Sequence, residues 1–328
     1  MELWGIETLL RTAGTLVVVQ CFLQINKVLR NYTPKQPKPV PFPFGSGIAH
    51  SYNVTVPSDL PFALGDGAGG MSVQGGREYM EDRIAVIRGL AKGAVWFGVF
   101  DGHGGAAVST FLSTRLPELL FSSSLNPYVA KEDDLPMMMK WAYLQADHEW
   151  TEMNKENPKW DGSTAVSALL IRTEGGGGWK VVVANVGDSR AVLCLKGDEV
   201  EELSVDHKPT HPGEKMRVEK LGGEISFHKG TWRVERTLAV TRAIGDTHLK
   251  PFVVAEPDIQ TREIKAGEKA SLILASDGLW DVISSLEAAQ IIQHCSTKRA
   301  EDAAKMLTIE ALRRGSKDNI TVLVYFFQ

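Results

Sequence analysis

The sequence predicts an α+β domain built on antiparallel strands, and three observations support this prediction. Five short apolar runs have the character of strands, and five other segments have helical patterns. The short connection 88–93 joins two of the runs, as expected of a hairpin between antiparallel neighbours. The chain has 328 residues, of which 43% are hydrophobic, so it is long enough to bury a large core.

The N-terminal region differs in kind from the rest of the chain. Residues 12–25 are almost entirely apolar, and four basic residues follow them, at Lys27, Arg30, Lys35 and Lys38. A membrane span needs about twenty apolar residues, so this run alone favours an amphipathic or docking helix. Extension back to Leu3 supplies the length of a membrane anchor, and the basic residues would then leave the rest of the chain facing the cytoplasm. Without an anchor we expect a cytosolic protein.

Residues 34–44, PKQPKPVPFPF, contain five prolines, which favours a stiff extended linker. We therefore divide the chain into a hydrophobic segment 1–30, a proline-rich linker 31–66 and a compact domain 67–328. The formal net charge of -4 gives no electrostatic basis for nucleic-acid binding. The three cysteines are widely spaced and form no CxxC pair, which fits a reducing compartment. None has an arginine six positions later, which excludes a cysteine-phosphatase loop.

Acidic residues lie at the ends of the strand-like runs. Three runs end near an acid, and two begin just after one. The runs are 84–87, 94–100, 181–186, 271–276 and 320–327, and the acids are Glu81, Asp82, Asp101, Asp188, Asp277 and Asp318. In an antiparallel sheet the end of one strand lies beside the start of its neighbour, so five or more of these carboxylates are expected to meet at one rim.

Carboxylates gathered in this way must take up protons or bind cations. Hard oxygen ligands suit Mg²⁺ or Mn²⁺. A single aspartate after a strand is more often a turn residue, but here aspartate recurs beside glycine or asparagine. We therefore expect Asp101 to bind metal, Gly102 to offer its carbonyl oxygen, and His103 to act as an acid–base group, because imidazole titrates near neutrality.

Helices are expected outside these strands. Glycines at Gly104 and Gly105 allow a turn into the first helical pattern. The five patterns cover residues 104–120, 135–154, 214–221, 285–295 and 298–314. The last one ends in Arg-Arg-Gly, a suitable helix stop.

Eight short motifs, in this order, resemble those of the type-2C metal-dependent serine/threonine protein phosphatases (the PPM/PP2C family). They are REYMED (77–82), VFDGHGG (99–105), GSTA (162–165), NVGDSR (185–190), DHKP (206–209), LAVTRAIGD (238–246), ASDGLWDV (275–282) and GSKDNIT (315–321). Together they cover about residues 69–328 and are far more specific than any single motif.

This resemblance implies a four-layer α-β-β-α sandwich of two antiparallel sheets flanked by helices, with metal ions in a cleft at one edge. It implies that Asp101 bridges two Mg²⁺ or Mn²⁺ ions, with Gly102 contributing its carbonyl. The remaining ligands would be Asp277 and Asp318 for the first ion, Glu81 and Asp82 for the second, and Asp188 and Asp246 for a weaker third.

The resemblance also implies a reaction. Arg77 would hold the substrate phosphate, and His103 would protonate the leaving serine or threonine oxygen. A metal-activated water would attack phosphorus, and no phosphoenzyme would form. The partner would be a phosphorylated protein, and we expect a monomer. Two alternatives are a pseudophosphatase that serves as a binding scaffold and a phosphatase that acts on a small phosphate ester.

One position departs from the family pattern. Arg236 stands where the family usually has glycine, next to the segment 206–236 that should contain a flap beside the cleft. The flap tryptophan by which some plant members dock into hormone receptors lies a few residues before the matching arginine. Here Trp232 immediately precedes Arg233, so that role does not carry over.

Overall fold

The computed structural model describes residues 52–55, 62–65 and 67–327, apart from 89, 91–92, 122–133, 174, 176 and 296–298. The hydrophobic segment 1–30 and most of the predicted linker lie outside these residues. Within the described ranges, the helices are all too short or too polar to cross a membrane.

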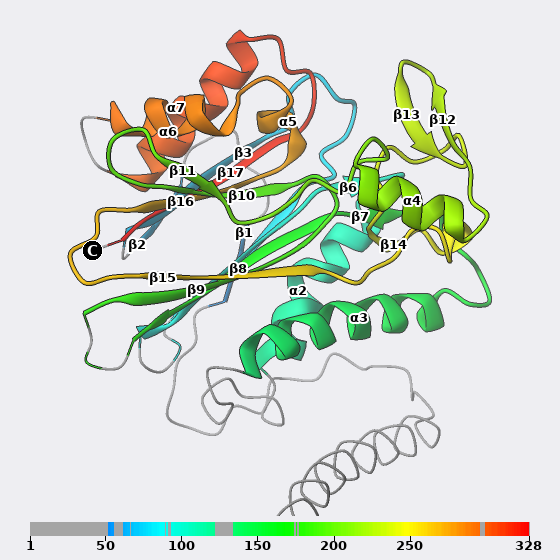
Figure 1. Ribbon diagram of the computed structural model, residues 1–328, viewed down its shortest axis with the longest axis horizontal. Coiled ribbons are helices and arrows are strands. Elements are labelled where there is room, and N and C mark those ends of the chain that lie inside the picture. The colour runs from blue at the N-terminus through cyan, green and yellow to red at the C-terminus, as the bar shows by residue number, and fades with distance from the viewer. Residues whose placement is uncertain are drawn as a thin grey trace, which may run out of the picture. The chain divides into compact units, whose positions relative to one another are not determined.

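Two six-stranded antiparallel sheets form the centre of the domain (Figure 1). The first sheet contains, in spatial order, β1 (Tyr52–Thr55), β4 (Arg83–Ile87), β5 (Val95–Phe100), β8 (Ala165–Arg172), β9 (Trp179–Val186) and β15 (Asp258–Ile264). The second contains β11 (Val200–Glu202), β10 (Arg190–Cys194), β16 (Ser271–Ala275), β17 (Ile320–Phe326), β3 (Ala68–Val73) and β2 (Phe62–Gly65). All five predicted runs therefore form strands.

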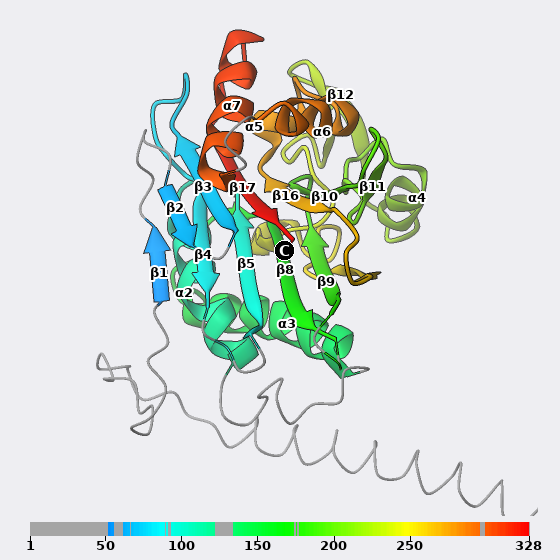
Figure 2. The ribbon, with the colours of Figure 1, turned by 90° about the vertical axis from the view of Figure 1, so that its left-hand side faces the viewer.

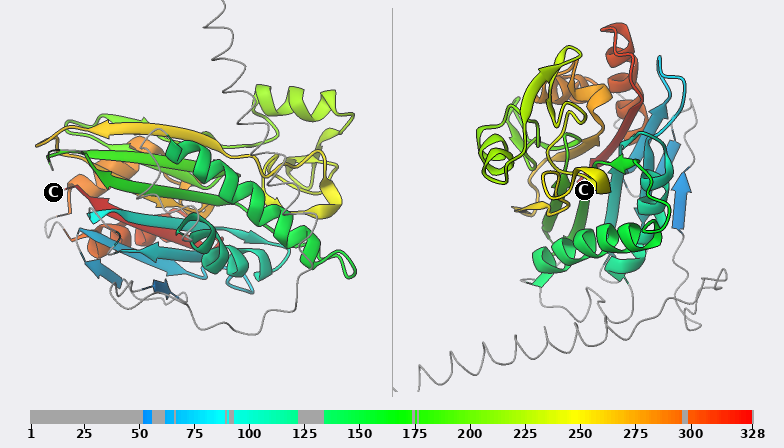
Figure 3. Two further views of the ribbon diagram at one scale, coloured as in Figure 1. Left: turned by 90° about the horizontal axis from the view of Figure 1, so that it is seen from below. Right: turned by 90° about the vertical axis from the view of Figure 1, so that its right-hand side faces the viewer.

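Helices cover the outer face of each sheet, as Figures 2 and 3 show from other sides. The first sheet is covered by α2 (Ala107–Phe121) and α3 (Leu135–Met153), and the second by α6 (Ser285–Gln293) and α7 (Ala300–Arg313). A short helix, α5 (Asp277–Trp280), follows β16. The result is the predicted four-layer α-β-β-α sandwich. The first helix begins at Ala107 and not at Gly104, because Gly104 and Gly105 have φ of 70° and 142°.

Burial on β5 explains why the layers hold together. All six of its residues are buried, and neighbouring side chains point to opposite faces of the sheet. Trp96 and Phe100 pack in the core between the first sheet and its helices. Phe97 and Val99 pack in the core between the two sheets. A third apolar layer lies between the second sheet and its helices.

The sheets begin upstream of Gly67. Strands β1 and β2 fall within residues 31–66, the segment predicted to be a linker. Tyr52–Thr55 pairs with β4, and Phe62–Gly65 pairs with β3, each as an edge strand. Prolines are excluded from central strands but not from the loops beside edge strands. The proline content of this region therefore suggested a linker, although the region also contains these two edge strands.

Strand register brings the acids to one end of the sandwich. Arg83 pairs with Phe100, so Glu81, Asp82 and Asp101 lie at the same edge of the first sheet. Ala275 pairs with Val322, which places the segments after β16 and before β17 together in the second sheet.

Smaller elements complete this end. A three-stranded sheet has the order β14 (Ile244–Gly245), β7 (Gly162–Ser163), β6 (Gly102–His103). Helix α4 (Pro212–Lys220) and the hairpin of β12 (Ile225–His228) and β13 (Thr231–Val234) form the predicted flap. In Figure 1 the flap lies at the right-hand end of the sandwich, beside β6 and β7.

Candidate active site

A pocket of about 270 Å³ lies at the end of the sandwich where the acids gather. Eight of the ten predicted site residues line it: Arg77, Glu81, Asp101, Gly102, His103, Asp188, Asp277 and Asp318. Arg233 of the flap and Leu238, which follows the flap in the chain, also line the pocket. The other two predicted residues, Asp82 and Asp246, are buried. A groove of about 520 Å³ between α6 and α7 contains none of the ten, so the chemistry belongs to the smaller pocket.

Arg77 lies in the loop between β3 and β4, and Asn319 fixes the shape of this loop. The Asn319 side chain accepts from the Glu81 backbone N–H at 2.7 Å and donates to the carbonyls of Gln74 at 2.8 Å and Tyr79 at 3.0 Å. Arg77 Nη2 contacts Asp318 Oδ2 at 2.5 Å. The Arg77 side chain is 55% exposed, so its guanidinium is accessible to a ligand in the pocket.

Asp82 joins the two sheets at their common rim. It precedes β4 of the first sheet and accepts a hydrogen bond at 2.8 Å from Ser276, which follows β16 of the second. Its other oxygen, Oδ1, is buried and has no hydrogen-bond partner among the described residues. Burial raises the pKa of Asp82 to about 6. A buried carboxylate oxygen without a donor is suited to a cation.

Three other acids of the site, Asp101, Asp277 and Asp188, also have raised pKa values. Burial and the neighbouring carboxylates raise the pKa of Asp101 and of Asp277 well above the usual range. Burial also raises the pKa of Asp188 to about 6, although Lys208 lies 3.6 Å from its Oδ2. This donor set fits Mg²⁺ or Mn²⁺, because divalent cations relieve such crowding and prefer oxygen ligands.

The fit depends on more than side-chain carboxylates. Within the described ranges, no three Asp, Glu, His or Cys side chains form a ready-made metal-binding group. The predicted ligand set also uses the Gly102 carbonyl, and Asp318 is paired with Arg77. Gly102 is held close to the rim, since a Cβ there would lie 2.6 Å from the Glu81 carbonyl oxygen.

His103 lies beside Asp246, which the family resemblance assigned to a third metal site. His103 Nε2 and Asp246 Oδ2 are 2.8 Å apart. Burial lowers the pKa of His103, but the Asp246 carboxylate outweighs burial and the pKa is raised. A raised pKa favours the protonated imidazole, the state required of a general acid.

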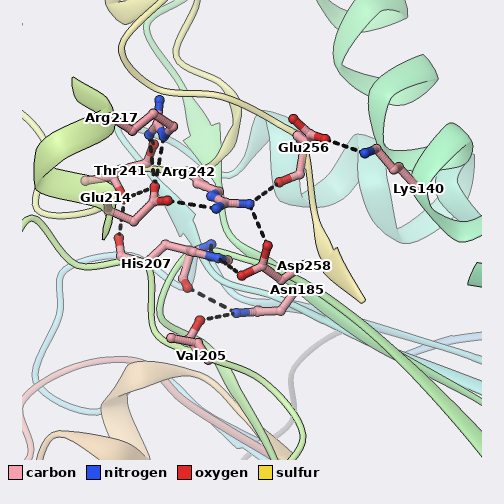
Figure 4. Close-up of polar contacts among 11 residues, drawn as sticks. Lys140, Asn185, Val205, His207, Glu214, Arg217, Thr241, Arg242, Glu256 and Asp258 are labelled. Carbon is pink, nitrogen blue, oxygen red and sulfur yellow. Dashed lines mark hydrogen bonds and ion pairs between the residues drawn. The ribbon is translucent and has the colours of Figure 1, made fainter. Parts of the chain in front are cut away.

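A buried polar network supports the turn that carries Asp188 (Figure 4). His207 Nδ1 accepts from the Gly187 backbone N–H at 3.1 Å, and His207 Nε2 donates to Asp258 Oδ2 at 3.1 Å. Asn185 donates to the Gly187 carbonyl at 3.2 Å. The turn before Asp188 is therefore held from both sides.

The same network continues to the flap. Arg242 donates to Asp258 at 2.9 Å and to Glu214 of α4 at 2.7 Å. Glu214 also accepts from Arg217 at 2.9 Å and from Thr241 at 2.7 Å. The base of the flap and the Asp188 turn thus share one set of hydrogen bonds.

Sequence reasoning did not identify the residues that fix the site from behind. These are Thr164, Asn319, His207 and Ser276. Thr164 donates its backbone N–H to the Asp101 carbonyl at 2.9 Å and bonds to the Ser189 hydroxyl at 2.7 Å. Each of these four residues lies inside a motif quoted above, and this was the signal in the sequence that could have identified them. Their supporting roles depend on contacts with residues distant in the sequence.

Comparison with known proteins agrees with this geometry. Residues 66–320, or 255 of the 328 residues, match the family described as Protein phosphatase 2C. The chain is 42% identical over 251 residues to Probable protein phosphatase 2C 11 of Arabidopsis thaliana, covering 76% of this chain and 62% of that protein. The chain thus spans less than two thirds of that relative's length. It is 38% identical over 265 residues to Protein phosphatase 1L of Bos taurus, covering 78% of this chain and 71% of that protein.

A solved structure has the same fold. Serine-threonine phosphatase 2C from Toxoplasma gondii superimposes with a TM-score of 0.65 and 28% identity, covering 86% of this chain and all of that one. Sequence match, fold and the clustered acids lead to one conclusion, that the chain belongs to the protein phosphatase 2C family.

Proposed function

We propose that this chain hydrolyses phosphoserine and phosphothreonine in proteins, with Mg²⁺ or Mn²⁺ as cofactor and without a phosphoenzyme. The observation that supports this most strongly is the convergence on one pocket of buried and half-buried acids, an accessible arginine and a histidine with a raised pKa. Acids hold cations, arginine matches phosphate oxygens, and the histidine supplies a proton.

The metal ligands would come from both sheets. Two ions would be held by Asp101, the Gly102 carbonyl, Asp277, Asp318, Glu81 and Asp82, and Asp188 would contribute to a weaker third site. When bound, the ions supply a water activated for attack on phosphorus and stabilise the charge of the transferring group.

The side chains divide the remaining work. Arg77 would bind two phosphate oxygens through its planar fork and so orient the phosphorus for in-line attack. As the bond from phosphorus to the serine or threonine oxygen breaks, its electron pair stays on that oxygen. His103 would donate a proton to it, leaving a neutral imidazole.

Two experiments separate this function from its alternatives. Turnover of phosphothreonine peptides should exceed turnover of free phosphometabolites, and the reverse order would favour a small phosphate ester as substrate. A chain that binds Mn²⁺ but releases no phosphate from either class would instead be a scaffold.

We also propose that residues 1–30 associate with a membrane and leave the domain facing the cytoplasm. The support is the apolar run 12–25 followed by basic residues. A fluorescent fusion of the full chain should locate to membranes, and deletion of residues 1–30 should release it. A cytosolic full-length fusion would contradict this. For the domain we propose a monomer, which light scattering during gel filtration would test.

A further inference from the structure

We propose that Asp246 is a positioning residue for His103. Its carboxylate holds the imidazole through Nε2 and leaves Nδ1 as the nitrogen that donates the proton to the leaving oxygen. This inference rests on the proposed function, and it assigns Asp246 to proton transfer and not to a third metal site.

The first support is the geometry of the pair. Nε2 of His103 lies 2.8 Å from Oδ2 of Asp246, the distance of a strong hydrogen bond to a charged acceptor. The Asp246 side chain is 2% exposed, whereas that of His103 is 27% exposed and lines the pocket. The carboxylate therefore lies behind the imidazole, and the imidazole faces the substrate space.

The second support is the small sheet that brings the two residues together. Strand β7 is central, with His103 paired to Gly162 on one side and Gly245 paired to Gly162 on the other. A Cβ on Gly162 would lie 1.9 Å from Asp246 Oδ2 and 2.3 Å from His103 Nε2. Glycine at 162 is thus required for the carboxylate and the imidazole to meet.

The third support is the backbone at Asp246. Its φ of 45° and ψ of 42° are left-handed, a conformation that non-glycine residues rarely adopt. Neighbouring contacts hold it there: the Asp246 N–H donates to the Asp161 carbonyl at 3.1 Å, and the Gly245 N–H donates to Asp147 at 2.9 Å. Strained residues that the surroundings fix in this way are concentrated at functional sites.

Asp188, the other acid assigned to the third metal site, has different partners. Lys208 Nζ lies 3.6 Å from Asp188 Oδ2 and 3.1 Å from Asp281 Oδ1. The hydrogen bonds and ion pairs of the two acids therefore differ. Asp246 contacts the imidazole and Asp188 contacts a lysine, although Asp188 is near enough to help raise the pKa of His103.

The two ring nitrogens of His103 would therefore have different roles. The Nε2 proton stays in the hydrogen bond to Asp246. The Nδ1 proton passes to the leaving alkoxide oxygen, an O–H bond forms, and the imidazole becomes neutral. Loss of the carboxylate would free the ring to rotate and weaken this transfer without removing a metal ligand.

The test compares two substrates in the full chain with Mn²⁺. For a phosphothreonine peptide, whose alkoxide needs a proton to leave, Asp246→Asn should lower kcat about 10- to 100-fold with KM nearly unchanged. For p-nitrophenyl phosphate, whose leaving group needs no proton, the same variant should lose less than about threefold. His103→Asn should show the same split, and the double variant should lose little more than His103→Asn alone.

Two further variants keep the test decisive. Gly162→Ala removes no polar group but displaces the pair, so it should reproduce the split between substrates. Asp147→Asn is the matched control, because it removes a nearby charge but keeps an oxygen that can accept from the Gly245 N–H, and it should show no split. Thermal unfolding of each variant would identify any that fail to fold.

Four results would overturn the proposal or its basis. Equal losses of kcat on both substrates in a folded Asp246→Asn variant would show that Asp246 has only a structural role. Loss of one bound Mn²⁺ in that variant, counted by calorimetric titration, would make it a metal ligand. If His103→Asn loses more activity on the phosphopeptide than on p-nitrophenyl phosphate but Asp246→Asn does not, Asp246 does not position His103. A wild-type chain that is inactive on both substrates would refute the proposed function itself.

Discussion

Arg77 and His103 both line the pocket, but they are expected to act at different stages of the reaction. Arg77 holds the phosphate from binding onward, so Arg77→Ala should raise KM about 10- to 100-fold, the cost of a lost charge-assisted hydrogen bond. His103 acts only as the leaving oxygen departs, so His103→Ala should lower kcat about 100-fold with a smaller effect on KM. Steady-state kinetics on a phosphothreonine peptide would distinguish them.

Arg115→Ala provides the matched control for this comparison. Arg115 pairs with Glu149 between α2 and α3 and does not line the pocket. It should therefore leave both constants nearly unchanged. Equal increases in KM for the Arg77 and His103 variants would refute the division of roles.

At the level of residues, the acids at strand ends were predictable. Asp101, Asp277 and Asp318 each adjoin a strand whose apolar run is visible in the sequence, so their convergence followed from antiparallel pairing. The contact of Asp246 with His103 was not predictable. It depends on β6, β7 and β14, which have two residues each and so leave no periodic pattern.

The flap is anchored by the buried carboxylate of Glu214 on α4. Its pKa falls to about 2, because hydrogen bonds from Arg242, Arg217 and Thr241 outweigh the effect of burial. Glu214→Gln should lower the free energy of unfolding by about 3 kcal/mol, since two partly buried arginines would lose their partner. Urea denaturation at pH 7 would measure this loss.

The pH dependence of wild-type stability gives a second test of the same group. A lowered pKa stabilises the folded state above the unfolded value near 4.5, and this contribution is lost as pH falls toward about 2. The difference between wild type and Glu214→Gln should therefore shrink below about pH 4. A difference of under 1 kcal/mol at pH 7 would contradict the anchoring role.

Arg236, the departure from the family pattern, lies in the turn after β13. Glu235 and Arg236 have φ of 48° and 57°, so both are left-handed. Left-handed geometry costs a non-glycine residue about 1–2 kcal/mol. Glycine would avoid this cost, but its greater entropy in the unfolded state would offset part of the gain. Arg236→Gly should therefore raise stability by about 0.5–1 kcal/mol in denaturant melts.

Thr237→Gly is the control for this turn. Thr237 lies next to Arg236 but is not left-handed, so glycine there should only destabilise. A loss of stability in Arg236→Gly as large as that in Thr237→Gly would mean that the Arg236 side chain makes a stabilising contact that outweighs the backbone cost.

At the level of elements, the sequence predicted the long pieces and missed the short ones. Runs such as 320–327 and 285–295 carry strong patterns and formed β17 and α6 close to the expected bounds. Strands β1 and β2 have four residues each in a proline-rich context, where composition suggested a linker. Pairing with a neighbour distant in sequence, not local propensity, makes them strands.

The whole domain should respond to metal through its buried acids. Burial raises the pKa of Asp82 and of Asp188 from 3.8 to about 6. A raised carboxyl pKa means that their contribution to stability is present below about pH 4 and is lost as pH rises through about 6. Mn²⁺ replaces the protons, so it should stabilise the protein more at pH 7.5 than at pH 5.

The expected gain is about 2–3 kcal/mol at pH 7.5 when Mn²⁺ exceeds its Kd about 100-fold. Denaturant melts with and without Mn²⁺ at the two pH values would measure it. Asp277→Asn should reduce the gain. An equal gain at both pH values would indicate that Mn²⁺ binds elsewhere.

The four-layer arrangement itself was predicted through the family resemblance, and the strand-end acids were predicted independently of it. Both lead to the same rim, where the two sheets meet through Asp82 and Ser276. The polar network behind the rim was not predictable, because His207, Asp258 and Glu214 come from separate elements joined only by folding.

The central claim is that the buried acids bind the cations that drive phosphate release. The most direct measurement follows phosphate release from a phosphothreonine peptide by the full chain with Mn²⁺, with EDTA, and by Asp277→Asn at saturating Mn²⁺. We predict release by the wild type with Mn²⁺ and near-background rates in the other two cases. A full rate in Asp277→Asn, or in EDTA, would contradict the claim.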